Sequence, residues 1–124
     1  MKNFIWASLL AATPVLASPA LAQDWAVHGT DQRLDRATLE AAIMPGPLVF
    51  YDDGQAQFSP DGGYAYTLSD INGGATSFGT YQLSDDGVVC VTYENGLSRC
   101  DLYVKSGDRL VVITQEGGRF PVRP

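Results

Sequence analysis

The sequence predicts a mainly β protein, an antiparallel meander of about eight strands that forms a small up-and-down barrel or a strongly curled sheet. Seven turn signals, each built on Gly with Asp, Asn, Glu, Ser or Pro, recur between Leu48 and Val122. The runs between them are rich in Val, Tyr, Thr and Leu, which favour strands. An open sheet would expose an edge strand at each end, and closing the sheet removes those edges. A two-sheet sandwich is the alternative architecture.

Residues 1–22 have the pattern of a cleaved signal peptide. Lys2 supplies a positive start, the run from Phe4 to Val15 is apolar, and an Ala-Leu-Ala sequence ends at Ala22. The apolar run is shorter than the 18 or more residues that a membrane span needs. We therefore expect cleavage between Ala22 and Gln23 and a periplasmic or secreted location.

Cleavage would leave residues 23–124, which is 124 minus 22, or 102 residues, enough for one domain with a modest core. We expect an arm at 23–34 and a single β domain at 35–124 that begins with a short helix. Loss of Lys2 takes the net charge from −6 to −7. Such acidity disfavours binding to nucleic acid. The sequence also lacks the basic amphipathic segment that would indicate binding to a membrane surface. The chain is expected to be a monomer without stable membrane insertion.

The one predicted helix runs from Asp35 to Ile43. Asp35 is a candidate N-cap, Leu39 and Ile43 form an apolar stripe, and residues 44–47, Met-Pro-Gly-Pro, end the helix. No further helix is predicted after Leu48. The later run 110–113 is apolar at every position, so both of its faces should be covered, and the helix is a candidate for the outer cover.

The stretch 78–104 holds three strand patterns, two hairpin turns and both cysteines. A strict two-residue turn at Asn95-Gly96 would pair Cys100 with Val91 and place the cysteines on opposite faces. A three-residue loop with Gly96 in the left-handed conformation pairs Cys90 with Cys100 instead, at a non-hydrogen-bonded site within disulfide range. We therefore predict a Cys90–Cys100 disulfide, which fits an oxidising compartment. It should stabilise the fold by about 2 to 3 kcal/mol on the chain-entropy model.

Four short motifs resemble a group of small exported proteins of Gram-negative bacteria that share a Gly-Thr-aromatic strand followed by two cysteines. They are Leu48-x-Phe50-Tyr51-Asp52-Asp53-Gly54, Gly79-Thr80-Tyr81, Gly87-x-x-Cys90-Val91 and Cys100-Asp101-Leu102-Tyr103. The resemblance implies a periplasmic β-rich domain with a disulfide and implies no activity. A weaker likeness is to periplasmic metalloprotease inhibitors, small eight-stranded barrels, whose Gly-x-Trp-x-Leu strand is matched by residues 79–83 with Tyr81 in place of Trp.

Each candidate for chemistry also has a structural explanation. His28 lacks a second histidine to share a metal, and a surface position is the better interpretation. The acidic pairs Asp52-Asp53 and Asp85-Asp86 directly precede Gly, where Asp is favoured by turn geometry. The tyrosines could line a cavity, although aromatic residues in strands more often pair across strands and fill the core. They are Tyr51, Tyr64, Tyr66, Tyr81, Tyr93 and Tyr103.

We predict no catalytic, cofactor-binding or metal-binding residues, so the expected protein is not an enzyme. The first hypothesis is a non-catalytic envelope domain that acts by protein or surface interaction. The alternative is a small barrel that binds a small apolar ligand, or one that inhibits a secreted protease through its N-terminal arm. An enzyme would need carboxylates brought together from separate turns. The partner is accordingly an unidentified protein or small ligand.

Overall fold

The computed structural model describes residues 24–124, so the expected signal peptide lies outside the described residues. The α-helix is α1 (Arg36–Ile43), and η2 (Asp70–Asn72) is a short 3-10 turn. The strands are β1 (Asp31–Arg33), β2 (Leu48–Val49), β3 (Gln55–Phe58), β4 (Gly63–Thr67), β5 (Thr76–Leu83), β6 (Val88–Tyr93), β7 (Ser98–Ser106), β8 (Arg109–Ile113) and β9 (Arg119–Pro121).

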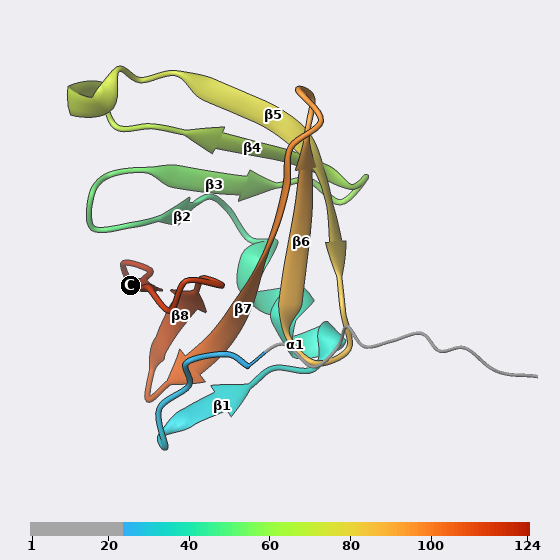
Figure 1. The fold of residues 1–124 in the computed structure, drawn as a ribbon, viewed down its shortest axis with the longest axis vertical. Coiled ribbons are helices and arrows are strands. Elements are labelled where there is room, and N and C mark those ends of the chain that lie inside the picture. Colours follow the sequence, from blue (N-terminus) through green and yellow to red (C-terminus); the bar gives the residue numbers. More distant parts are fainter. Residues whose placement is uncertain (1–23) are drawn as a thin grey trace, which may run out of the picture.

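Strands β2 to β9 form an antiparallel meander in which each strand pairs with the next along the chain. The sheet is strongly curled into a half-barrel, and Figure 1 shows β2–β5 facing β7 and β8 across the interior. Its two ends touch at a bridge between Phe50 and Val122, where the Arg123 N–H also donates to the Val49 carbonyl at 2.7 Å. The predicted fold class, a curled meander of about eight strands with one short helix, is confirmed.

Helix α1 forms where the sequence predicted it. The Asp35 side chain caps its first turn by accepting from the Thr38 N–H at 2.8 Å. Leu39 and Ile43, four residues apart, are both 0% exposed and belong to the main core. The expectation of no helix after Leu48 is wrong for one turn only, because η2 occupies the loop between β4 and β5.

The two faces of the curled sheet carry different apolar clusters. The inner cluster includes α1 together with residues of β2–β8. The outer cluster is smaller, and its members are Leu102, Val104, Val111 and Ile113, packed with Trp25 and Val88. Strand β8 is therefore covered on both faces, as its sequence requires. The expected outer cover is wrong, however, because α1 packs inside the curl and Trp25 of the N-terminal segment covers the outside.

The Cys90–Cys100 disulfide joins β6 to β7 with the register that the three-residue loop predicted. Gly96 has φ 92°, and the Tyr93 N–H donates to the Leu97 carbonyl at 2.8 Å. The two Cα atoms are 4.0 Å apart, as expected for a directly opposed, non-hydrogen-bonded pair. Because the neighbouring Val89 and Val91 face the inner core, alternation places the disulfide on the outer face.

The N-terminal segment contributes a strand that the sequence did not reveal. β1 pairs with the end of β7, just beyond the position where the first residue of β6, Val88, pairs with Leu102. Asp31 in β1 also accepts two hydrogen bonds from Arg119 in β9, at 2.8 and 3.0 Å, and one from the His28 N–H at 2.7 Å. These donors hold the pKa of Asp31 down to about 2, with the Arg119 hydrogen bond as the largest cause. β1 is thus tied to β7 by strand pairing and to β9 by the Asp31–Arg119 ion pair.

Candidate functional site

A cavity of about 590 Å³ opens on the inner face of the curled sheet, away from α1. Its walls are mainly aromatic and aliphatic, and its rim is polar. The lining residues are Phe50, Asp52, Ala56, Tyr64, Tyr66, Tyr93, Arg99, Asp101, Tyr103, Val112, Thr114, Glu116, Gly118 and Phe120. This is the size and character of a small-molecule site.

The lining side chains point into the cavity because alternate residues of a strand lie on the same face of the sheet. Tyr64 and Tyr66 are two residues apart in β4, and Arg99, Asp101 and Tyr103 are successive alternate residues of β7. Such residues share one face of a strand. The opposite face of β7 carries Cys100 and Leu102, so a single strand supplies both the disulfide and the polar wall of the cavity.

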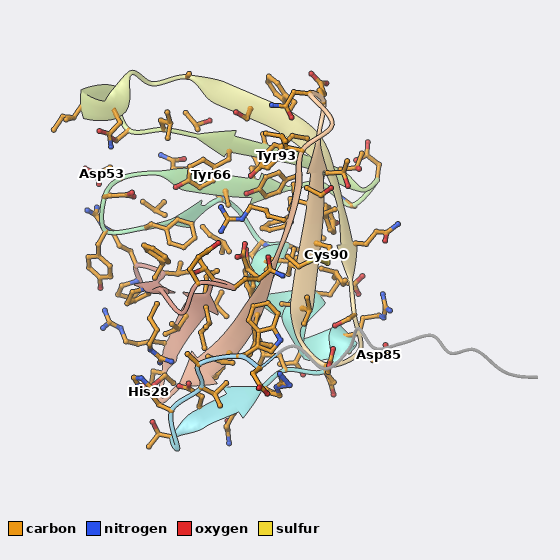
Figure 2. All side chains as sticks on the ribbon, in the orientation of Figure 1. His28, Asp53, Tyr66, Asp85, Cys90 and Tyr93 are labelled. Carbon is orange, nitrogen blue, oxygen red and sulfur yellow. A yellow bond between two sulfur atoms is a disulfide. The ribbon has the colours of Figure 1, made fainter. Side chains whose placement is uncertain are left out.

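Gly79 allows the sheet to curl tightly beside the cavity. It lies in register between Tyr64 of β4 and Tyr93 of β6, whose ring centroids are 6.0 Å apart in an edge-to-face arrangement. A Cβ atom on Gly79 would come 2.3 Å from the Thr92 carbonyl oxygen, which is backbone and cannot move aside. The missing side chain therefore lets Tyr64 and Tyr93, which belong to non-adjacent strands, meet. Figure 2 labels Tyr66 of β4 and Tyr93 of β6, which both line the cavity.

The charged pair in the wall is Arg99 and Asp101. The Arg99 Nε and Nη2 donate to the two carboxylate oxygens of Asp101 at 3.0 and 2.9 Å. This bidentate hydrogen bonding raises the pKa of Arg99. The Asp101 side chain is only 13% exposed, whereas that of Arg99 is 48% exposed. The pair therefore presents a neutralised, oriented polar surface to the cavity.

Tyr64, Tyr66 and Tyr103 in the cavity wall have raised pKa values and stay protonated over the physiological range. Burial raises the pKa of Tyr64 and of Tyr103, and the charge of Asp101 raises that of Tyr103 further. Burial followed by the charge of Asp52 likewise raises the pKa of Tyr66. These phenols consequently serve as neutral hydrogen-bonding groups on otherwise apolar walls.

Two further carboxylates stand at the rim, each supplied by a turn. Asp52, in the β2–β3 turn, accepts from the Gly54 N–H at 2.9 Å, which fixes the carboxylate near the hydroxyl of Tyr66. Glu116 lies in the β8–β9 turn, which is closed by the Gly118 N–H donating to the Thr114 Oγ1 at 3.0 Å. Two separate turns therefore each contribute a carboxylate to the cavity.

Four of the six tyrosines considered from the sequence meet at this cavity, namely Tyr64, Tyr66, Tyr93 and Tyr103. Tyr81 instead packs against Phe58 and donates its hydroxyl to the Ser59 carbonyl at 2.7 Å. Tyr51 lies outside the cavity, with the Arg109 and Arg123 guanidinium carbons 5.4 and 5.5 Å from its ring centroid. The expectation that the tyrosines could line a cavity therefore holds for four of the six.

The other candidates from the sequence are dispersed. His28 is exposed in the segment before β1. Asp53 pairs with Arg123 at 2.7 Å and Asp85 pairs with Arg36 at 2.9 Å, so neither acidic pair acts as a carboxylate couple. Only Asp52 among these four acids lines the cavity.

Sequence reasoning missed the Arg99–Asp101 pair. A signal for it existed, because the Cys90–Cys100 register places Arg99, Asp101 and Tyr103 on the face opposite the disulfide. Which of the two faces is concave could not be read from that register. The polar wall was therefore recognisable as one face of β7, but not as part of a cavity.

Among residues 24–124, no group of three or more His, Cys, Asp or Glu side chains is arranged to hold a metal ion. The same residues contain no helix that is long and apolar enough to span a membrane. Comparisons of the chain with family models, curated proteins and solved structures gave no match. The resemblance to exported proteins of Gram-negative bacteria therefore stays a prediction.

Proposed function

We propose that this protein is an exported, non-catalytic binding module that holds a small organic ligand in its tyrosine-lined cavity. The observation that carries the proposal is the cavity itself. Its volume of about 590 Å³ lies within the range of roughly 300 to 1,000 Å³ that is usual for ligand sites. A few polar groups converge on mainly apolar walls, which is how such sites combine affinity with orientation.

Two observations support export to the periplasm or beyond. The N-terminal residues have the charge and apolar pattern of a signal peptide. The Cys90–Cys100 disulfide is of the kind that persists in oxidising compartments. A binding module with an acidic surface would work there as a free domain.

The chemistry of the cavity favours binding over catalysis. Asp101 is engaged by Arg99 through both carboxylate oxygens, so it is not free to transfer a proton. The raised pKa values of Tyr64 and Tyr103 keep these phenols protonated, because burial disfavours their charged forms. A hydrogen-bonded carboxylate and neutral phenols can orient a ligand, but they do not act as a base or a nucleophile.

A protein-interaction role is the second candidate, and exposed apolar side chains favour it. Ile71 in η2 is 94% exposed, and Leu97 in the β6–β7 turn is 67% exposed. Protease inhibition through the arm has less support, since β1 is paired with β7 and Trp25 packs on the outer cluster. An arm that enters a protease cleft would have to be free of such contacts.

Native mass spectrometry of the mature protein, gently purified from the periplasm, tests the proposal. We expect the mass of residues 23–124 less two hydrogens, plus a ligand mass that disappears on denaturation. Val112→Phe, which fills the cavity, should abolish the added mass. Thr92→Phe places the same ring on the exposed outer face of β6 and should retain it. A protein that carries no added mass, even after incubation with its own periplasmic extract, would contradict a binding role.

A further inference from the structure

The charges around the cavity are unequal. Three carboxylates line it, those of Asp52, Asp101 and Glu116, against the single guanidinium of Arg99. The cavity therefore has a formal charge of −2, and the mature chain as a whole is expected to be acidic as well. An acidic protein with an acidic site attracts cations and repels anions.

From this imbalance we propose that the ligand is an organic monocation, an amine or quaternary ammonium group carried on an apolar body. The inference rests on the proposed binding function and specifies its ligand class. The apolar part would lie against Phe50, Val112 and Phe120, and the cationic part would lie among the tyrosines beneath the acidic rim.

The aromatic walls suit a cation. A ring attracts a positive charge to its face, and organic ammonium ions are commonly bound by clusters of such rings. Here four tyrosines and two phenylalanines line one cavity, and the close pairs among them are Tyr64 with Tyr93 and Phe50 with Tyr66, at 6.0 and 6.3 Å between centroids. The pKa values of Tyr64, Tyr66 and Tyr103 are raised, so these phenols attract a cation without adding a charge of their own.

Arg99 does not make the cavity a site for anions. Its Nε and Nη2 already donate to both oxygens of Asp101. An anionic ligand that took the guanidinium would leave the largely buried Asp101 carboxylate without its partner, which is costly. It would also approach Asp52 and Glu116 at the rim.

Asp52 is well placed to meet the cation. The Gly54 N–H holds one of its oxygens, and its charge is felt by the nearby Tyr66 hydroxyl. The other carboxylate oxygen, Oδ2, is available for a positive group at the entrance. Glu116, on the β8–β9 turn, also lines the cavity, so two acids from separate turns would be available to the charge of the ligand.

Isothermal titration of the mature protein with three probes of one shape tests the proposal. The probes are choline, its uncharged isostere in which carbon replaces nitrogen, and the carboxylate with the same branched carbon skeleton. We expect choline to bind at least about tenfold more tightly than the uncharged isostere, and the carboxylate to bind most weakly. The preference should shrink as salt is raised, because the rim carboxylates are partly screened.

Two variants and a matched control test whether the preference for choline depends on the carboxylates of the cavity. Asp52→Asn keeps a side-chain oxygen for the Gly54 N–H while removing the charge. Glu116→Gln removes the charge at the other turn. Each should reduce the preference for choline over the isostere by about threefold or more. Asp108→Asn removes the same charge from an exposed turn outside the cavity and should leave the preference unchanged.

The outcomes separate this inference from the binding function itself. Equal binding of choline and its isostere, or tightest binding of the carboxylate, would overturn the cation assignment and leave the binding module standing. An Asp108→Asn effect as large as that of Asp52→Asn would also overturn it, because the preference would then reflect total charge. If no probe binds while native spectra show a bound mass, the cation inference fails alone. If neither is seen, the binding function fails with it.

Discussion

The two ends of the interior of the curled sheet are built in opposite ways. At one end, α1 inserts Leu39 and Ile43, both 0% exposed, into an apolar cluster. At the other end, the same strands present Tyr66, Arg99 and Asp101 to an open cavity. Figure 1 shows α1 behind β6 and β7, covering only part of the space that the sheet encloses.

This contrast separates what holds the fold from what is available for function. The closed end buries its apolar surface fully, so its residues should govern stability. The open end combines buried wall residues such as Tyr64 and Tyr103 with partly exposed side chains such as those of Arg99 and Phe120. The partly exposed side chains should contribute little to folding. Substitutions at the two ends should therefore have opposite effects on stability and on ligand retention.

The largest effect is expected at the closed end. Ile43→Ala should lower the free energy of unfolding by about 2 to 5 kcal/mol, because it leaves a cavity in a buried cluster. Phe120→Ala, at a side chain of the open end that is 49% exposed, should cost less than about 1 kcal/mol. Urea denaturation of both variants gives the comparison. Similar losses at both sites would show that the open end is also structural core.

Loss of the disulfide comes next. The Cys90→Ala, Cys100→Ala double variant should lose about 2 to 3 kcal/mol of stability on the chain-entropy model. Because the disulfide lies on the outer face of β6 and β7, the cavity on the inner face should still retain its ligand below the new melting temperature. Thermal denaturation and native mass spectrometry measure the two quantities. Ligand loss in a variant that is still folded would mean that the disulfide on the outer face is needed to keep the shape of the cavity on the inner face.

Asp31→Asn tests the link between the N-terminal strand and β9. The variant should lose about 1 to 2 kcal/mol at neutral pH, since two charge-assisted hydrogen bonds from Arg119 are weakened. The pKa of Asp31 is lowered from 3.8 to about 2, so its contribution is complete above pH about 4 and disappears as the pH falls toward 2. The stability of the variant should thus approach that of the wild type in acid. Asp24→Asn serves as the control, and a gap between wild type and Asp31→Asn that is unchanged at low pH would contradict the assignment.

The smallest stability effect is expected from Tyr66→Phe. This change removes one hydroxyl at the open end and should alter the free energy of unfolding by less than about 1 kcal/mol while weakening ligand retention. Tyr81→Phe is the matched change, and it should lower stability by about 1 kcal/mol through loss of the bond to the Ser59 carbonyl, with no effect on the ligand. Native mass spectrometry and urea denaturation together distinguish them. The reverse pattern would place the functional surface elsewhere.

Much of the fold was predictable because its rules are local. Gly96 in the left-handed conformation set the hairpin register, and that register paired Cys90 with Cys100. Asp35 began the helix by capping it. β1 was missed because a three-residue strand, Asp-Gln-Arg, has no apolar alternation, and its pairing with β7 depends on residues more than seventy positions away.

The candidate site was predictable only in part. Alternation placed Tyr64 with Tyr66, and the disulfide register placed Arg99 with Asp101, each pair within one strand. Their meeting depends on the curl of the sheet at Gly79, where β5 passes close to the backbone of Thr92. No pattern within a single strand reports that curvature.

The sequence by itself determined the antiparallel meander, the helix, the disulfide and the expectation of export, because turn glycines, strand alternation and a capping residue act over a few neighbouring positions. Tertiary structure alone decided that the concave face is the one bearing Arg99 and Asp101, that α1 covers only one end of it, and that Trp25 covers the outer face. Those outcomes depend on how strands far apart in the chain pack against one another. The cavity, and with it the proposed function, belongs to that second group.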